Sequence, residues 1–129
     1  MPSITFLSTD TIIKINADQT RLYGGLHRVR DEALLDSAVH RPQVTAQGKY
    51  LFEDCFSMAA TYAHGIIKNH PFIDGNKRTG MLAALLFLGI NGYFPVISND
   101  ELVELGINIA TNAVSLEEFA VLLRTKSIQ

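Results

Sequence analysis

Apolar residues recur every three or four positions along most of this chain, which is the spacing of one face of an α-helix. The longest example lies between residues 51 and 67, where two such series interleave. Together they predict a long helix with a broad apolar face. The two series are Leu51, Cys55, Ala59, Tyr62 and Ile66, and Phe52, Phe56, Ala63 and Ile67.

The first third of the chain contains start and stop signals for two more helices. Ser8 or Thr9 can cap the first, and the pair Gly24–Gly25 can end it. Asp31 can cap the second, which Pro42 ends. We expect the following residues to face inward: Ile12, Ile15 and Leu22 in the first helix, and Leu34, Leu35, Ala38 and Val39 in the second.

An uninterrupted apolar run extends from Met81 to Ile90, inside a helix that begins near Asn76 and stops at residues 91–92. The run is about half as long as a membrane span requires, so we interpret it as part of a buried helix. Because it is apolar on every side, this helix must be central, with other helices packed around it. We expect its N-terminus to open at the protein surface.

Two shorter helices are predicted after the central one. Ser98 or Asn99 starts the first, and Ser115 with Glu118 forms a capping box for the second. Residues 44–50 and 93–97 are too short for more than a hairpin or an extended loop. The predicted class is therefore all-α, with about six helices around a central apolar helix and a short flap or hairpin.

The composition indicates a folded chain and argues against nucleic acid as a partner. At 129 residues, of which 47% are hydrophobic and 19% charged, the chain is expected to form a single domain over residues 1–129. A net charge of −2 provides no basic field for nucleic acid. The start lacks a signal peptide, and the only cysteine, Cys55, excludes an intrachain disulfide, so we expect a cytoplasmic protein. Cys55 itself is expected to be a buried core thiol.

A polar stretch, NHPFIDGNKRTG at residues 69–80, leads into the central helix. The N-terminus of a helix offers unpaired N–H groups and a partial positive charge, which together attract anions. Lys77 and Arg78 lie in the first turn, where the helix dipole disfavours cations. Two basic residues at this end indicate that an anion binds there.

The same stretch contains groups suited to a reaction. His70 can take a proton near neutral pH, and Asp74 offers the hard oxygen that Mg²⁺ prefers. Gly75 lets the main chain pass close to a ligand, and Lys77 and Arg78 can neutralise phosphate. A base, a metal ligand and an anion site together indicate phosphoryl or nucleotidyl transfer from a nucleotide to a hydroxyl group.

Each residue also has an ordinary structural explanation when taken alone. A histidine at a helix end is often a cap, and an aspartate before Gly-Asn is common in turns. Asn76 can cap the helix or hold the loop, and Phe72 is expected to be a buried anchor of the loop. The combination of these residues, and not any one of them, favours catalysis. A Walker-type phosphate loop, an HExxH zinc motif and a GxSxG elbow are all absent from the sequence.

Residues 70–78, HPFIDGNKR, resemble the signature H-P-F-x-[DE]-G-N-[GK]-R of the Fic/Doc family. Residues 23–43 also resemble the death-on-curing branch of that family, and the similarity extends from about Tyr23 to Gly92. The resemblance implies an all-α fold. It also implies transfer of part of a nucleoside triphosphate, such as ATP, to a hydroxyl group of a protein.

The resemblance implies specific roles. His70 is expected to be the catalytic base and Asp74 to hold Mg²⁺. The phosphates are expected to contact Gly75, Asn76, Lys77 and Arg78. A flap at about residues 44–50 is expected to dock the target protein by strand addition. Its candidate docking residues are Val44, Thr45, Ala46 and Gln47.

Two positions differ from the nucleotidyl-transferring branch of the family. That branch has glycine in place of Lys77 and a second arginine in place of Met81. The death-on-curing branch shares the lysine, which implies transfer of the γ-phosphate to a serine or threonine, with a translation elongation factor as the implied target. AMP transfer remains an alternative. A catalytically idle interaction domain is another, although His70 and Asp74 are both present.

The chain lacks the [ST]-x-x-x-E-[GN] motif of inhibitory helices in this family. We therefore expect no restraint within the chain. By resemblance, the protein is a toxin that a separate antitoxin restrains, with the C-terminal segment of the antitoxin folded into a groove over the site.

Overall fold

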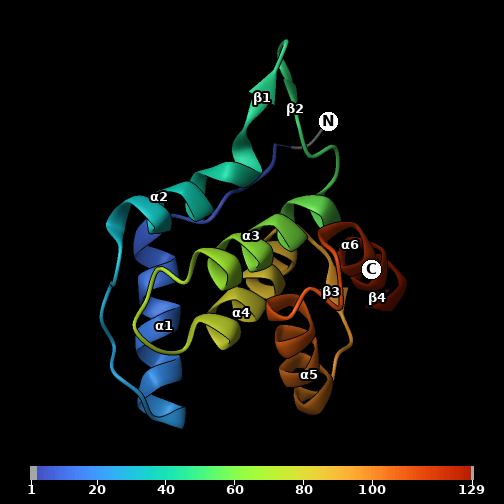
Figure 1. Cartoon of the computed structure of the whole chain (residues 1–129). Coiled ribbons are helices and arrows are strands. Elements are labelled where there is room, and N and C mark those ends of the chain that lie inside the picture. Colours follow the sequence, from blue (N-terminus) through green and yellow to red (C-terminus); the bar gives the residue numbers. More distant parts are fainter. Residues whose placement is uncertain (1–2, 129) are drawn as a thin grey trace.

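The structure, a computed structural model, describes residues 3–128 and contains six α-helices (Figure 1). This confirms the predicted all-α class. None of the described helices has the length and apolar character that crossing a membrane requires. The helices are α1 (Thr9–Tyr23), α2 (Glu32–His40), α3 (Cys55–Asn69), α4 (Asn76–Ile90), α5 (Asn99–Ala110) and α6 (Leu116–Lys126).

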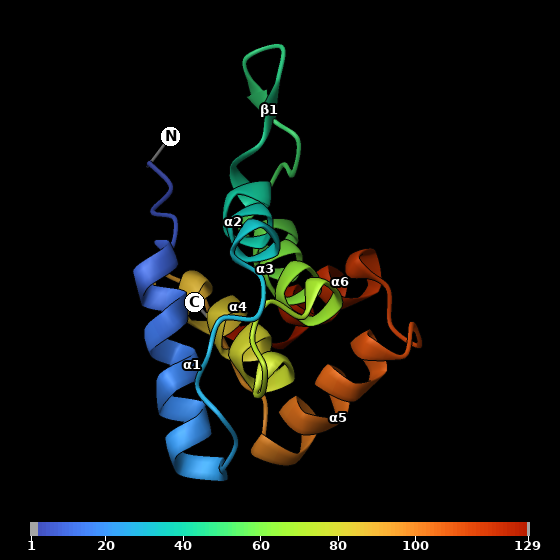
Figure 2. The same ribbon diagram turned by 60° about the vertical axis from the view of Figure 1, so that its left-hand side comes forward.

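Strands are confined to two short antiparallel pairs. β1 (Thr45–Ala46) and β2 (Lys49–Tyr50) form a hairpin that follows a 3₁₀ turn at Arg41–Gln43 and projects from the helical body (Figures 1 and 2). β3 (Phe94–Pro95) pairs with β4 (Ser127–Ile128), which ties the segment after α4 to the end of α6. Both segments expected to be hairpins or extended loops therefore contain strand.

Side-chain caps set most helix starts. Ser8, Asp31, Ser98 and Ser115 cap α1, α2, α5 and α6 as the sequence predicts, because each side-chain oxygen accepts an N–H of the first turn. The capping box at Ser115 is confirmed, and Ser98 forms another. Asp54 caps α3 in the same way.

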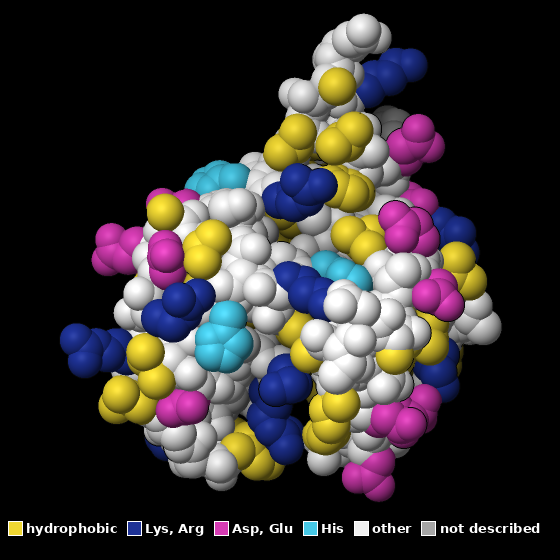
Figure 3. All heavy atoms as spheres, viewed as in Figure 1, with side chains coloured by type: hydrophobic (Ala, Val, Ile, Leu, Met, Phe, Trp, Pro, Cys, Tyr) yellow, Lys and Arg dark blue, Asp and Glu magenta, His cyan; other side chains and the backbone are white. Residues whose placement is uncertain are grey.

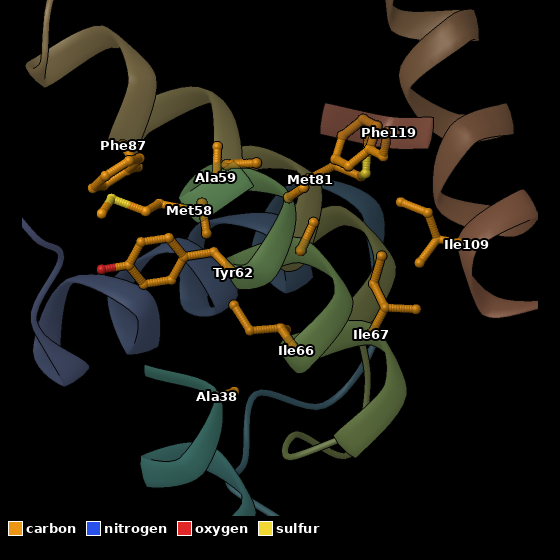
Figure 4. Packing of buried hydrophobic residues seen from close by; sticks show 14 of the residues in the cluster. Ala38, Met58, Ala59, Tyr62, Ile66, Ile67, Met81, Phe87, Ile109 and Phe119 are labelled. Carbon is orange, nitrogen blue, oxygen red and sulfur yellow. The ribbon is translucent and has the colours of Figure 1, made fainter. Parts of the chain in front are cut away.

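The core is built around α3 and α4, which pack against each other along their lengths (Figure 2). α2 and α6 cover α3, while α1 and α5 cover α4, so the prediction of a central helix after Asn76 is confirmed. The aromatic and sulfur side chains of the two helices interlock in the interior (Figure 4). A Cβ at Gly80 would lie 3.0 Å from Ile67 Cγ1 and 3.1 Å from Ala63 O, so glycine permits this close approach.

Three side chains that the sequence predicts to be buried are exposed or only partly buried: Leu22, Leu51 and Cys55. Leu22 is 60% exposed, because α1 ends at the surface and its inner face there is formed by Asn16 and Thr20. Leu51 is 53% exposed and precedes α3, which begins only at the Asp54 cap. Phe52 likewise precedes α3. Cys55 is the first residue of α3 and is only partly buried, although it packs against the core.

Candidate active site

The loop between α3 and α4 turns at His70. This residue ends α3 in the left-handed conformation (φ 51°, ψ 54°), and its N–H donates to Ile66 O at 3.1 Å. Phe72 is fully buried beneath the loop. The side-chain amide of Asn76 donates to Phe72 O at 2.9 Å and accepts from Phe72 N at 3.0 Å. These hydrogen bonds fix the main chain at His70, where the loop begins, and between Phe72 and Asn76, where it ends.

Residues 25–31, here called the strap, run antiparallel to this loop. Val29 forms a β-bridge with Phe72, and Ile73 N donates to Arg28 O at 2.9 Å. The guanidinium of Arg30 donates from Nε to His70 O at 2.7 Å and from Nη2 to Asn69 O at 2.9 Å. The strap therefore fixes the main chain that carries His70.

The strap and α1 also orient Asp74. Leu26 N donates to Asp74 Oδ2 at 2.8 Å, and Asn16 Nδ2 donates to Asp74 O at 2.8 Å. Gly25, at φ +110°, passes so close that a Cβ there would lie 2.9 Å from Asp74 Cβ. His27 Nδ1 lies 2.7 Å from Asn16 Oδ1, which holds the Asn16 amide in place. One carboxylate oxygen of Asp74 is thus held by the main chain.

α4 begins without a side-chain cap, unlike the other five described α-helices. Gly75 occupies the cap position at φ 79°, and a Cβ there would lie 3.1 Å from Asn16 Nδ2. Because no side chain is in the way, the first N–H groups of α4 are accessible to a ligand. Arg78 stacks on Tyr23, with its guanidinium carbon 3.7 Å from the ring centroid.

A cavity of about 420 Å³ lies at this helix start. It brings together all of the predicted catalytic, metal-binding and phosphate-binding residues, and α5 supplies an apolar wall that includes Val103 and Ile107. The predicted residues in its lining are His70, Asp74, Gly75, Asn76, Lys77 and Arg78. The proposed docking residues at 44–47 lie apart from it, in the hairpin.

The donor set fits a magnesium ion that arrives with a nucleotide. Asp74 is exposed and supplies a single carboxylate, and residues 3–128 contain no cluster of three His, Cys, Asp or Glu side chains. Mg²⁺ is commonly held by one or two carboxylates, substrate phosphates and water, so Asp74 is sufficient on the protein side. A metal bound by protein groups alone does not fit this site.

Sequence reasoning missed four residues of the site: Asn16, Tyr23, Gln19 and Arg30. Tyr23 and Gln19 line the cavity from α1, and Arg30 acts on the loop from the strap. Of these four residues, only Asn16 could have been identified from the sequence. It is a polar residue in step with the apolar face of α1, and the structure buries it completely.

A model of the Fic/DOC family matches residues 6–88. The chain is 46% identical over 70 residues to "Toxin Doc" of Mycolicibacterium smegmatis, an alignment that covers 54% of each chain and so about half the length of that relative. It is 32% identical over 118 residues to "Protein kinase doc" of Escherichia phage P1, and this alignment covers 92% of each chain.

Proposed function

This chain belongs to the Fic/DOC family, and we propose that it transfers the γ-phosphate of a nucleoside triphosphate to a serine or threonine hydroxyl of a protein. The observation that carries the proposal is the cavity at the uncapped start of α4, which unites a histidine, a carboxylate and two cations. The relative named as a protein kinase, which aligns over 92% of the chain, supports the same reaction.

In the proposed reaction, His70 accepts the proton of the attacking hydroxyl group. The hydroxyl oxygen forms a bond to the γ-phosphorus, and the bond from that phosphorus to the bridging β,γ-oxygen breaks. The leaving nucleoside diphosphate takes the electron pair of the broken bond. The positive charges of Lys77 and Arg78 and the N–H groups of the α4 start stabilise the negative charge on the phosphates.

Asp74 would hold the Mg²⁺ of the nucleotide, and the ion supplies charge neutralisation on the phosphates when it is bound. The Leu26 N–H keeps the carboxylate oriented toward the cavity that it lines. Asn76 contributes in a different way from the other phosphate-site residues. Its side chain is occupied by Phe72, so contact with phosphate falls to its main-chain N–H.

AMP transfer is the competing outcome within the family. Two features of the cavity favour phosphate transfer. Lys77 lies in the first turn of α4, where its side chain competes for the space beside the helix start. Met81 lines the same cavity and offers no second cation.

We further propose that the protein is the toxin of a toxin–antitoxin pair. The relative named "Toxin Doc" supports this biological role. The proposed toxin would arrest growth by phosphorylating a translation elongation factor, which the β1–β2 hairpin would bind. A separate antitoxin would restrain it by folding over the cavity.

The decisive experiment uses ATP labelled at either the α- or the γ-phosphate. The purified protein is incubated with each and with cell lysate, and His70→Ala serves as the inactive control. We expect only the γ-label to reach protein. Transfer of the α-label would establish nucleotidyl transfer instead, and transfer of neither label to any protein would contradict both reactions.

A further inference from the structure

A second hollow, of about 310 Å³, lies on the face of α3 that is bounded by the end of α2 and the start of α6. We call it the basic hollow. Arg41 and Lys68 line it together with Ser37, Thr61, His64 and Asn69, and no acidic side chain is part of the lining. Figure 3, viewed as in Figure 1, shows Lys, Arg and His side chains on the face of the helical body below the hairpin.

The basic hollow has unused hydrogen-bonding capacity. His64 Nε2 is buried and has no partner among the described residues. Burial, followed by the nearby charge of Lys68, lowers the pKa of His64, while Glu117 and the Ser115 main chain act in the opposite direction. In the tautomer that carries its proton on Nε2, a neutral imidazole can donate this N–H to an incoming acceptor such as a carboxylate.

The two cations are held at its edge without a carboxylate partner. The Arg41 guanidinium lies 5.6 Å from the Phe52 ring centroid and forms no salt bridge within residues 3–128. Lys68 Nζ donates to Ala110 O at 3.2 Å and to the side chain of Asn112, both uncharged acceptors. An anionic group in the hollow would therefore meet two positive charges that form no salt bridge within residues 3–128, with Glu117 as the nearby negative charge on the α6 side.

The position of the basic hollow connects it to the proposed reaction. Arg41 opens the turn that leads into the β1–β2 hairpin, and Asn69 precedes His70 directly in the chain. The hollow thus lies between the element proposed to dock the target and the base proposed to activate its hydroxyl group. A protein segment that reaches from one to the other passes this surface.

We propose that the basic hollow binds an acidic side chain, aspartate or glutamate, of the protein that accepts the phosphate. This inference rests on the proposed transfer to a protein hydroxyl and adds a specificity determinant to it. His64 and His70 are six positions apart, roughly 9 Å along a helix axis. An extended segment covers that length in about three residues, so the acidic residue lies about three positions from the modified serine or threonine.

The test uses fluorescent decapeptides with one central serine and one glutamate at each position in turn, with glutamine in matched controls. Binding to the His70→Ala protein is measured by polarisation, because this variant separates docking from transfer. We expect the peptide with glutamate about three positions from serine to bind at least roughly fivefold more tightly than its glutamine control, and salt to weaken this preference.

Charge reversal locates the preference. Arg41→Glu should abolish it, and Lys68→Gln should reduce it. Lys14→Glu, an exposed position on α1 outside the hollow, should leave it unchanged. Circular dichroism confirms that each variant is folded. Equal binding of glutamate and glutamine peptides would overturn the inference, as would a preference that survives in Arg41→Glu, or binding of inorganic phosphate with no binding of either peptide.

Different results would contradict the proposed γ-phosphate transfer and the proposed binding of an acidic side chain. A glutamate preference without any transfer of the γ-label would leave an acidic docking site on a protein whose proposed reaction is wrong. Transfer of the γ-label with no glutamate preference would remove the docking site and leave the reaction. Where transfer occurs, Arg41→Glu should raise KM for the protein target several-fold and leave KM for ATP unchanged.

Discussion

The Arg30 guanidinium donates to the main-chain carbonyl of His70 at 2.7 Å, across 40 positions of sequence. A second N–H of the same group donates to Asn69 O at 2.9 Å. His70 is one of three described non-glycine residues with positive φ, a conformation that costs roughly 1 kcal/mol or more for an L-residue. The fork from Arg30 helps to hold the candidate base in this unfavourable conformation.

We predict that Arg30→Ala lowers kcat about tenfold or more and changes KM for ATP little. Loss of two charge-assisted hydrogen bonds lets the imidazole leave its productive position, and small misplacements of catalytic groups are costly. Arg30→Lys should recover only part of the rate, since an ammonium lacks the planar fork. Arg28→Ala is the matched control in the same strap, because only the main chain of Arg28 bonds to the loop. Equal loss in both variants would show that strap stability, and not the fork, is responsible.

We predict that His70→Ala reduces transfer by roughly 10² to 10⁴ while the protein remains folded, because the side chain is exposed and its proposed work is proton abstraction. His70→Asn is the more discriminating variant. Asparagine adopts the left-handed conformation readily and so removes the base without adding backbone strain. Rates are measured with γ-labelled ATP. Growth arrest by a stably expressed His70→Asn protein would contradict the role.

We predict that Asp74→Asn removes most of the magnesium dependence of ATP binding. The amide oxygen can still accept from Leu26 N, so the loop keeps its shape while a negative charge is lost. Calorimetric titration with ATP, with and without Mg²⁺, measures the effect. If the wild type binds ATP equally well in both conditions, Asp74 only orients the turn.

A variant of Lys77 can distinguish the two family reactions. Its side chain lines the cavity, and a Cβ at Gly106 would lie 3.4 Å from Lys77 Cβ, so α5 confines its stem. We predict that Lys77→Gly loses γ-phosphate transfer and gains at most weak nucleotidyl transfer, because Met81 supplies no second cation. Mass spectrometry of the target distinguishes an added phosphate from an added nucleoside monophosphate. Unchanged activity in Lys77→Gly would indicate a solvated surface charge.

The lowered pKa of His64 predicts a pH dependence of stability. A histidine with a reduced pKa in the folded state binds its proton preferentially in the unfolded state, so acid favours unfolding. The free energy of unfolding should start to fall when the pH drops below about 6.5, the pKa of histidine in the unfolded state. It should stop falling once the pH is below the lowered pKa of His64 in the folded state. His64→Gln should flatten the profile in urea denaturation between pH 7 and pH 5. His40→Gln, at an exposed position of α2, is the control, and an unaltered profile in His64→Gln would count against this assignment.

The candidate catalytic motif could be predicted from the sequence because it is contiguous. His70, Asp74, Lys77 and Arg78 lie within one helical end and one loop, so local rules place them together. Four of the helix caps, Ser8, Asp31, Ser98 and Ser115, were predictable for the same reason. The residues that orient the motif could not be predicted. Arg30, for example, donates to main-chain carbonyl groups, and no periodicity or spacing in the sequence identifies such acceptors.

The same distinction explains the errors. Leu22 continues the apolar spacing of α1, but the helix ends one residue later and no element covers the Leu22 side chain, which is 60% exposed. Leu51 and Phe52 continue the spacing of α3 backwards past Asp54, whose capping hydrogen bond at 2.8 Å begins the helix later. In both cases tertiary contacts and caps, which periodicity does not contain, decided the outcome.

The pairing of the strap with the α3–α4 loop has a consequence for isolated pieces of this chain. A fragment that spans only residues 55–92 would retain the whole signature and both central helices. It would lack Arg30, Leu26 N and Asn16, which fix the loop from outside. In the intact fold, the strap is held against the α3–α4 loop. A strap supplied by a flexible chain would lose conformational entropy on reaching that position. An excised helix–loop–helix peptide of residues 55–92 should therefore show no transfer, although it contains the whole signature.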